Sequence, residues 1–280
     1  MPILNLDNKH RMQNFIGGID YTNTEIIEDN TNWVFAQRDN ISIAASTGLI
    51  RVSFDNSETW TNSIAFGSAD LINQGWIHSN GNISIMTKEN KIYYTTSALS
   101  SVTECDIFLE DGVTPYVPHT PIDPDYPGFY YNTTSQQENG LKDDVYVFIN
   151  YSNAYDSGGT PMHIMYSIDY GVSFKTAYRF GQYSRYYDDG TPEGGPTGTV
   201  LGNASSSILI KHGHSIVYCP YNGKWLCFTG DRIWAPAPAA NEIHWFWLTY
   251  DDIGDSWSIE DIDFGFIPNT DSRLKTDDGF

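Results

Sequence analysis

Short runs of alternating apolar and polar residues, separated by turn residues, recur along most of this chain. Residues 33–36, 41–45 and 49–53 form three such runs, and the last two are separated by a turn at Thr47-Gly48. Alternation over four to eight residues is typical of half-buried strands. No long stretch carries apolar residues at the i, i+3, i+4 and i+7 positions of an amphipathic helix. The pattern therefore predicts an all-β protein.

The predicted strands fall into four groups of similar layout. Each group contains short strands joined by tight turns, of which Asn80-Gly81 is the strongest hairpin signal. Repeats of about 40–45 residues with four strands are typical of β-propeller blades. Together with the family resemblance of the turn motif described below, this layout predicts a single β-propeller domain over residues 1–280, with about five four-stranded blades. The four blades that can be traced cover approximately residues 33–66, 75–108, 129–180 and 206–264.

The two ends of the chain lie outside these four groups. Residues 1–32 and 265–280 could share one sheet and close the ring as a fifth blade. Alternatively, another chain could complete the ring. A ring of four or six blades is also compatible with the repeats, so the number of blades stays open at this point.

One turn motif occurs three times between predicted strands, at residues 53–60, 167–174 and 250–257. Each copy has a polar residue, an Asp two positions later, a turn-permissive residue two further on and an aromatic residue three beyond that. An Asp carboxylate can accept backbone N–H groups across a tight turn, and Gly tolerates positive φ. The aromatic ring folds back and buries apolar area. The matched positions are Asp55 and Trp60; Asp169, Gly171 and Phe174; and Asp252, Gly254 and Trp257.

Not every copy of the motif is complete. In the first copy Ser57 replaces Gly, so we expect that turn to be more strained or differently shaped. A fourth, degenerate copy is predicted at residues 95–102, where Ser97 replaces the Asp and Val102 replaces the aromatic residue. The motif therefore marks one turn in each of the four predicted blades.

The motif resembles the Asp-box, or BNR repeat, of sialidase-like β-propellers. The resemblance implies a turn between the third and fourth strands of a blade, on the rim away from the ligand-binding face. It also implies that the Asp residues brace turns and are not catalytic. A sialidase needs three Arg residues to clamp a carboxylate, a Tyr nucleophile activated by Glu, and an Asp acid/base. The family's Arg-Ile-Pro-like motif is missing here, and Arg51 suits a structural role, so sialidase activity is not favoured.

A second pattern, at residues 211–231, resembles a blade motif of bacterial and phage Asp-box proteins. It has a His-x-His strand, a Tyr-x-Pro turn and a Thr-Gly-Asp end. His212 and His214 alternate on a predicted inner strand and should share one face, where Asp231 and Arg232 could join them. The cluster could bind metal or sugar, or supply acid/base groups to a glycan-active enzyme. The alternative, which we favour, is a hydrogen-bonded network that fixes blade packing.

Three long insertions separate predicted strands, at residues 110–144, 181–205 and 231–241. Long loops on a rigid β scaffold often carry binding residues. Aromatic side chains cluster in the first two insertions, where they could stack on sugars or pack on proteins, or instead cover the base of their own loop. The candidate binding residues are Tyr126, Tyr130, Tyr131, Tyr183, Arg185, Tyr186 and Tyr187.

The formal net charge of −20 limits the partners. It argues against nucleic acid and anionic membranes, because both are bound by clustered Lys and Arg residues. Acidic loops keep an aromatic-rich chain soluble. Bound Ca²⁺ is the alternative reading, but the acidic clusters lack EF-hand spacing, so no cofactor is predicted. The candidate Ca²⁺ ligands are Asp188, Asp189 and Glu193, or Asp123 and Asp125.

The three cysteines, Cys105, Cys219 and Cys227, show no metal-binding spacing. Cys219 and Cys227 lie on neighbouring predicted strands and could face each other. An odd number of cysteines without a disulfide framework suits synthesis in a reducing compartment. We find neither a signal-peptide pattern nor a long apolar segment, so we expect synthesis in the cytoplasm without membrane insertion.

The composition is similar to that of bacteriophage tail components, with many Asn, Tyr, Gly and Asp residues and few Lys residues. This resemblance implies a non-enzymatic virion protein of the tail, hub or receptor-binding type. Its partners would be other tail proteins or a cell-surface glycan, and it could form homo-oligomers. The alternative is a sialidase-like glycoside hydrolase or a polysaccharide lyase that uses the His-x-His strand.

Overall fold

The computed structural model describes residues 33–46, 48–69, 72–87, 91–116, 134–136, 145–150, 162–185, 197–203, 205, 209–210, 213–229 and 244–262. These residues form strands and the turns between them, without an α-helix, so the prediction of an all-β protein is confirmed. No helix in this part of the chain is long and apolar enough to cross a membrane.

The first two sheets, named blade 1 and blade 2, are four-stranded antiparallel meanders. Tight turns with positive φ join their first two strands, at Asp39 in blade 1 and at Gly81 in blade 2. Blade 1 contains β1 (Trp33–Arg38), β2 (Ile41–Ser46), β3 (Leu49–Ser53) and β4 (Asn62–Ala65). Blade 2 contains β5 (Ile72–Ile77), β6 (Asn82–Thr87), β7 (Ile92–Thr96) and β8 (Thr103–Glu104).

Blade 3 and blade 4 repeat this meander order. Blade 3 contains β10 (Thr134–Gln136), β11 (Tyr146–Ile149), β12 (His163–Ser167) and β13 (Ser173–Arg179). Blade 4 contains β16 (Gly213–Cys219), β17 (Lys224–Thr229), β18 (Trp245–Asp251) and β19 (Ser256–Asp261). Between them the chain forms a separate two-stranded sheet of β14 (Gly181–Arg185) and β15 (Thr197–Gly202).

Blade 3 has a fifth strand at its outer edge. β9 (Asp106–Phe108) runs parallel to β13, with Ile107 opposite Phe174. Thr176 Oγ1 donates a hydrogen bond to the Phe108 carbonyl at 3.2 Å. The sequence pattern placed residues 106–108 at the end of the second blade, but their hydrogen-bonding partner belongs to the third. Alternation within one strand cannot reveal which neighbouring sheet that strand joins.

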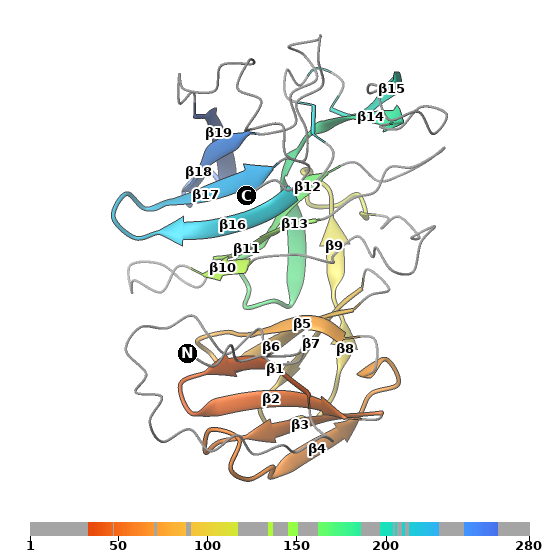
Figure 1. Ribbon diagram of the computed structural model, residues 1–280, viewed down its shortest axis with the longest axis vertical. Helices are drawn as coiled ribbons and strands as arrows, with labels where there is room; N and C mark the ends of the chain where they lie inside the picture. Colours follow the sequence, from red (N-terminus) through yellow and green to blue (C-terminus); the bar gives the residue numbers. More distant parts are fainter. Residues whose placement is uncertain are drawn as a thin grey trace, which may run out of the picture.

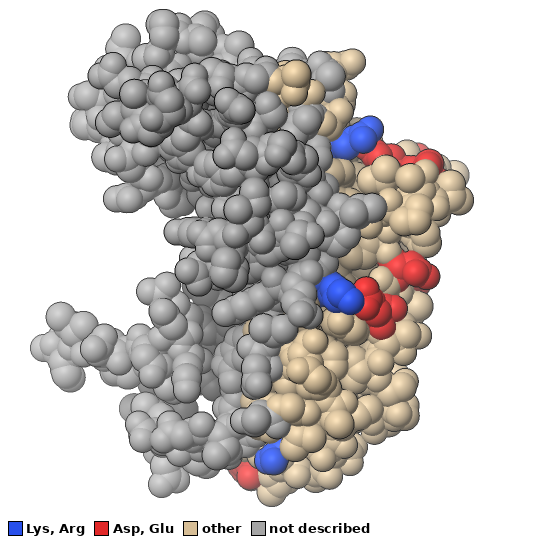
Figure 2. Space-filling view, turned by 90° about the vertical axis from the view of Figure 1, so that its right-hand side faces the viewer, with Lys and Arg blue, Asp and Glu red and all other residues tan. Residues whose placement is uncertain are grey.

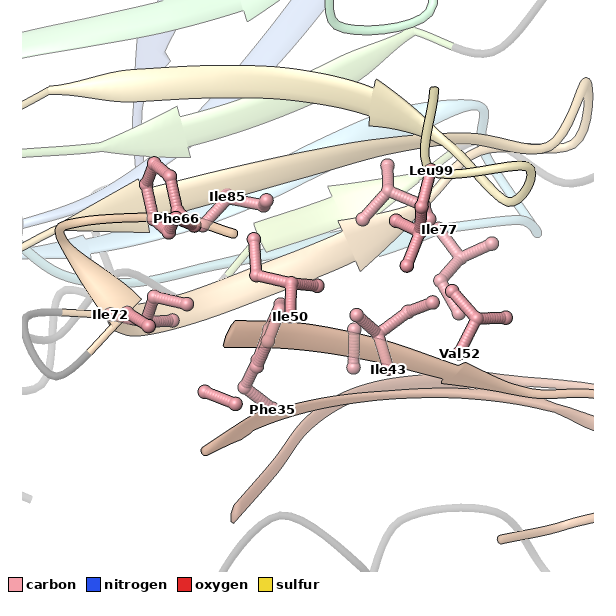
Figure 3. Packing of buried hydrophobic residues seen from close by; sticks show 13 residues of the cluster. Phe35, Ile43, Ile50, Val52, Phe66, Ile72, Ile77, Ile85 and Leu99 are labelled. Atoms are coloured by element: carbon pink, nitrogen blue, oxygen red, sulfur yellow. The ribbon is translucent and has the colours of Figure 1, made fainter. Parts of the chain in front are cut away.

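Apolar side chains fill the space between successive blades. Blades 1 and 2 enclose a cluster that includes Phe35, Ile43, Ile50 and Ile85, all buried (Figure 3). A second cluster around Tyr146 and other aromatic residues joins blades 2 and 3, and a third joins blades 3 and 4. A fully buried Ile or Phe side chain contributes about 1.5–3 kcal/mol, so these layers hold the blades together.

The four sheets follow one another in chain order along the long axis of the molecule (Figure 1). The first strands of neighbouring blades lie beside each other: β1 of blade 1 is next to β5 of blade 2, and β10 of blade 3 is next to β16 of blade 4. Four-stranded meanders that pack face to face in this way are the blades of a β-propeller. Residues 1–32 and 265–280, expected to close the ring, lie outside the described residues.

The three cysteines are free thiols. Cys219 lies opposite Lys224 in the β16–β17 ladder, and Cys227 lies opposite Ile216. The possibility that Cys219 and Cys227 face each other is therefore wrong, because the register of the hairpin offsets them. Burial raises the pKa of the Cys105 thiol and of the Cys227 thiol well above the ordinary value. Neither thiol is therefore set up as a reactive thiolate.

Candidate functional site

The turn between β3 and β4 is held by one serine and one aspartate. Ser53 Oγ donates to Asp55 Oδ1 at 2.6 Å and accepts the Ser57 backbone N–H at 2.9 Å. Thr59 donates its N–H to Asp55 Oδ1 (2.8 Å) and its hydroxyl to Asp55 Oδ2 (2.5 Å). The hydrogen bonds from Ser53 and then Thr59 lower the pKa of Asp55 from 3.8 to about 2. The carboxylate is a turn brace and not a general acid at neutral pH.

The turn between β12 and β13 has the same hydrogen-bond pattern. Ser167 Oγ donates to Asp169 Oδ1 at 2.7 Å and accepts the Gly171 N–H at 2.9 Å. Ser173 donates its N–H to Asp169 Oδ1 (3.0 Å) and its hydroxyl to Asp169 Oδ2 (2.6 Å). Tyr170 and Gly171 both have positive φ, as do Asn56 and Ser57 in blade 1. Ser57 therefore adopts the strained conformation that the sequence predicted for that position.

The aromatic residues that end these two turns differ in burial. Phe174 is fully buried and packs in the cluster between blades 2 and 3, at 5.6 Å from the Phe148 ring. Trp60 is only partly buried. In the degenerate copy of blade 2, Leu99 stands at the position that Gly171 occupies in blade 3 and has φ +49. Its side chain is buried in the cluster between blades 1 and 2 and so supplies the apolar contact of this turn. The motif pattern pointed to Val102, which packs only partly against the same cluster.

The turn between β18 and β19 is built differently. Ile253 donates its N–H to Asp251 Oδ1 at 3.1 Å, and positive φ occurs at Asp255. The expectation that Gly254 supplies the positive-φ residue is therefore wrong. The physical reason lies at the first motif position: Tyr250 cannot donate and accept within the turn as Ser53 and Ser167 do. The hydroxyl of Tyr250 lies at the far side of the ring and bonds Asp255 instead.

Asp255 joins blade 4 to blade 3. Its Oδ1 accepts hydrogen bonds from Tyr166 Oη (2.7 Å) and Tyr250 Oη (2.9 Å), and its Oδ2 pairs with Lys175 Nζ at 2.5 Å. Partial burial raises the pKa of Asp255, but the bonds from Lys175, Tyr166 and Tyr250 outweigh that effect and leave it lowered. Burial first, and Asp255 second, raise the pKa values of both tyrosines far above the ordinary value. A nucleophilic Tyr needs the opposite shift.

The turn of blade 3 also packs against blade 2. His78 Nε2 and Ser84 Oγ are hydrogen-bonded at 2.7 Å, and both residues are buried. A Cβ atom on Gly171 would lie 2.1 Å from Ser84 Oγ and 2.6 Å from His78 Nε2. Cys105 Sγ lies 3.1 Å from the Gly171 carbonyl, and Asn82 Nδ2 donates to the Tyr170 carbonyl. Because the Ser–His pair is buried beneath this turn, it is out of reach of a substrate and supports packing.

The hairpin between β16 and β17 extends from the side of blade 4 (Figure 1). Its tip exposes 97% of Tyr221, and Val217 on β16 is 50% exposed. Behind the tip, the Tyr218 ring packs on buried Trp225 at 4.9 Å, and Trp225 packs on Trp257 at 5.1 Å. The hairpin is thus a rigid support for exposed aromatic and apolar side chains. Tyr221 directly follows the Tyr-x-Pro turn of residues 218–220 and was not among the predicted binding residues.

Most of the predicted site residues lie outside the described part of the chain. His214 is described only as a backbone position of β16, where the register to β17 shifts between Gly213 and Ser215. Tyr183 and Arg185 lie on β14 and pair with β15, again as backbone positions. The remaining candidates fall outside the described residues: His212, Asp231, Arg232, Tyr126, Tyr130, Tyr131, Tyr186, Tyr187, Asp123, Asp125, Asp188, Asp189 and Glu193.

Among the described residues, most Lys and Arg side chains lie within 4.0 Å of one carboxylate. Examples are Lys91 with Glu104 (2.9 Å) and Arg179 with Glu110 (3.1 Å). Figure 2 shows the same arrangement on one face, where each described basic side chain lies close to an acidic one. No cluster of three or more His, Cys, Asp or Glu side chains suited to a metal ion occurs in the described ranges.

Comparisons with known proteins leave the family open. No family model matches the sequence, and no curated protein matches it. A solved structure of YCF48 bound to D1 peptide overlaps 85% of this chain with a TM-score of 0.39 and 9% identity. YCF48 from Cyanidioschyzon merolae overlaps 81% (TM-score 0.40, 9% identity), and a GH74 xyloglucanase from Xanthomonas campestris overlaps 79% (0.39, 10%).

These overlaps are loose and partial. The chain spans 55% and 57% of the two YCF48 chains and 28% of the xyloglucanase. At TM-scores below 0.5, neither the peptide bound to one protein nor the activity of another can be transferred to this chain. The assignment of a β-propeller therefore rests on the four meander sheets and their packing.

Proposed function

We propose that this chain is a non-enzymatic β-propeller that binds partners, as a virion tail, hub or receptor-binding component of a bacteriophage. The hairpin tip between β16 and β17 supports this role most directly. Tyr221 stands almost fully exposed there, on a strand pair that is braced from behind by Tyr218 and Trp225. A rigid aromatic side chain offers a large contact area at a small entropic cost, whether the partner is a glycan or a protein.

The polar clusters near the rim favour binding over catalysis. The two tyrosines that contact Asp255 have strongly raised pKa values, so they remain protonated and hydrogen-bonded at neutral pH. The carboxylate of Asp55 is committed to Ser53 and Thr59, which hold its pKa at about 2. These groups stabilise turns and blade contacts, and a contact surface needs such a rigid support.

Binding measurements on the purified chain test this proposal. We expect it to bind assembled tail particles or one glycan of a panel of sialylated and uronic-acid glycans, without turning the glycan over. Tyr221→Ala should weaken that binding at least about tenfold without a change in thermal unfolding, because exposed aromatic anchors carry much of an interface's energy. Val113→Ala is the matched control, because Val113 is also exposed (73%) but lies on the turn after β9.

Two results would overturn the proposal. Turnover of a glycan by the pure chain, lost in His214→Ala without loss of folding, would replace it with the glycoside hydrolase or lyase alternative. Equal binding by wild type and Tyr221→Ala would remove the hairpin tip as the contact surface.

A further inference from the structure

The outer edge of blade 4 differs from the outer edges of the other blades. β4 of blade 1 has four residues and β8 of blade 2 has two, so their free edges are short. The outer strand of blade 3, β13, is covered by β9. β19 has six residues, and no strand in the described part of the chain pairs with its outer side. Among the described outer strands, β19 therefore has the longest edge available for a further strand.

We propose that the outer edge of β19 is a docking site for an extended, basic segment of a partner protein, which adds to blade 4 as a fifth strand. This inference rests on the proposed binding role and names a partner class for it. Addition of an extended segment to a sheet edge is a common mode of peptide recognition, since backbone hydrogen bonds supply affinity.

Blade 3 shows within the same chain how such a strand is held. β13 begins at Ser173, directly after the turn, and β9 pairs with Ser173–Lys175. β19 begins at Ser256, directly after the corresponding turn, so the equivalent positions are Ser256–Ser258. In the described part of the chain between blades 3 and 4, β14 and β15 pair with each other and neither pairs with β19.

The backbone of β19 has the necessary polar groups. Ile262 donates its N–H inward to the Trp245 carbonyl at 2.8 Å. Backbone groups alternate along an antiparallel strand, so Trp257, Ile259 and Asp261 direct their N–H and C=O groups to the outer side. These are the donors and acceptors that an added strand would pair with.

The start of this edge is fixed before a partner arrives. Asp255 adopts φ +44 directly before β19 and is held there by Tyr166, Tyr250 and Lys175. Preorganisation lowers the entropic cost of binding. In the same turn Ile253 is 94% exposed, and its side chain can contact an apolar residue of the partner.

The acidic residues near the outer edge of β19 favour a basic partner segment. Asp251 ends β18, Asp252 lies in the turn, and Glu260 and Asp261 lie on β19. Glu260 pairs with Lys224 and Asp261 with His244, while 68% and 48% of the two acidic side chains stay exposed. Charged side chains on an edge strand oppose the addition of a strand that does not carry the opposite charge. The whole chain has a net charge of −20, so a second copy fits this edge poorly. A segment with Lys or Arg at alternate positions fits both the pleat and the charge.

Hydrogen exchange on the full chain tests the site with two synthetic probes. One is a capped peptide, Lys-Ile-Lys-Val-Lys-Ile, and the other has Glu in place of each Lys. At millimolar concentration we expect the Lys peptide to slow amide exchange at Trp257, Ile259 and Asp261 by at least about threefold, which corresponds to about two thirds or more of the sites being occupied. The Glu peptide should leave these amides unchanged.

Substitutions at the β19 edge and control substitutions elsewhere test whether the protection depends on this edge. Ile259→Pro removes one outward N–H and should abolish the protection. Glu260→Lys should weaken it while Glu58→Lys, which alters net charge equally at an exposed position of blade 1, should not. Ile253→Asp should weaken it more than Val113→Asp. Far-UV circular dichroism and thermal unfolding check each fold, and the charge variants decide the question if Ile259→Pro does not fold.

Four results would overturn the docking site. Equal protection by both peptides, or by neither, excludes a basic extended segment. Amides that are already protected in the peptide-free monomer would mean that the chain itself covers the edge. Protection that grows with protein concentration alone would identify a second copy as the occupant. If any of these occurs while Tyr221→Ala still weakens particle or glycan binding, only the edge is wrong and the binding role stands.

Discussion

The turns of blade 3 and blade 4 occupy the same place between third and fourth strands, but they are stabilised by different means. The blade 3 turn is held from within, by Ser167, Asp169 and Ser173. The blade 4 turn is held from outside, because Tyr166 and Lys175 of blade 3 bond Asp255. The side-chain brace of the first turn is local in sequence, whereas that of the second includes residues of the neighbouring blade. The stability of the blade 4 turn should therefore depend on the packing of blade 4 against blade 3.

The largest expected difference in folding stability is between alanine substitutions of the two glycines of these turns, Gly171 and Gly254. Gly171→Ala should destabilise the protein by about 2–5 kcal/mol, since positive φ costs a residue with Cβ about 1–2 kcal/mol and overpacking costs about 1–3 kcal/mol. Its φ is +78, and the added Cβ would meet Ser84 and His78 at 2.1 and 2.6 Å. Gly254→Ala should cost less than about 1 kcal/mol, because its φ is not positive and the nearest atom belongs to the exposed Asp251 side chain.

Urea unfolding of both variants measures this difference. Wild-type protein and Ser57→Ala are the controls, because Ser57 already carries a Cβ at φ +73 at the matched position of blade 1. Equal losses of stability for Gly171→Ala and Gly254→Ala would mean that the two turns are built alike after all.

Much of this architecture followed from residue patterns, and the parts that did not follow depend on tertiary contacts. Alternation and tight turns predicted most strands of the four blades, because both are local properties. The exceptions are β10, which lies in the predicted insertion at residues 110–144, and β14 and β15, which lie in the predicted insertion at 181–205. The role of Asp255 could not be predicted, since its partners Tyr166 and Lys175 lie 89 and 80 positions away. A signal existed at Tyr250, where a Ser or Thr is required for a self-contained turn. The addition of β9 to blade 3 and the exposure of Tyr221 left no local signal.

The two aspartates at the matched motif position provide the next test. Asp169→Ala should cost about 2–3 kcal/mol, because the two hydrogen bonds from Ser173 and the one from Ser167 are lost and their donors lose a charged partner. Asp252→Ala should cost less than about 1 kcal/mol, because Asp252 is exposed and substitutions at exposed positions usually change stability little. Thermal unfolding monitored by circular dichroism compares them. A larger loss for Asp252 would place it, and not Asp255, at the centre of the blade 4 turn.

The pH dependence of stability probes the contact between the two blades. The folded state lowers the pKa of Asp255, so its contribution is present above about pH 4, the ordinary Asp value, and is lost as the pH falls through the lowered pKa. Asp255→Asn should therefore lower stability by about 1 kcal/mol at pH 7, because partial exposure screens the charge, and by less below pH 4. Unfolding free energies of both proteins from pH 7 to pH 2 give this difference. A difference that stays constant with pH would exclude the Lys175 ion pair as its source.

The smallest expected effect tests whether a turn held from within can still be improved. Ser57 adopts φ +73 in blade 1, at the position that Gly171 occupies in blade 3. Ser57→Gly keeps the backbone N–H that Ser53 Oγ accepts, and it removes the steric cost of positive φ. The gain should be about 0.5 kcal/mol, because the relief of about 1–2 kcal/mol is partly offset by the greater freedom of Gly in the unfolded chain. Urea unfolding resolves such a gain when Ser57→Ala is measured beside it and shows none. A loss of stability in Ser57→Gly would mean that the serine side chain contributes to the turn, and the two self-contained turns would then differ from each other as well as from the turn of blade 4.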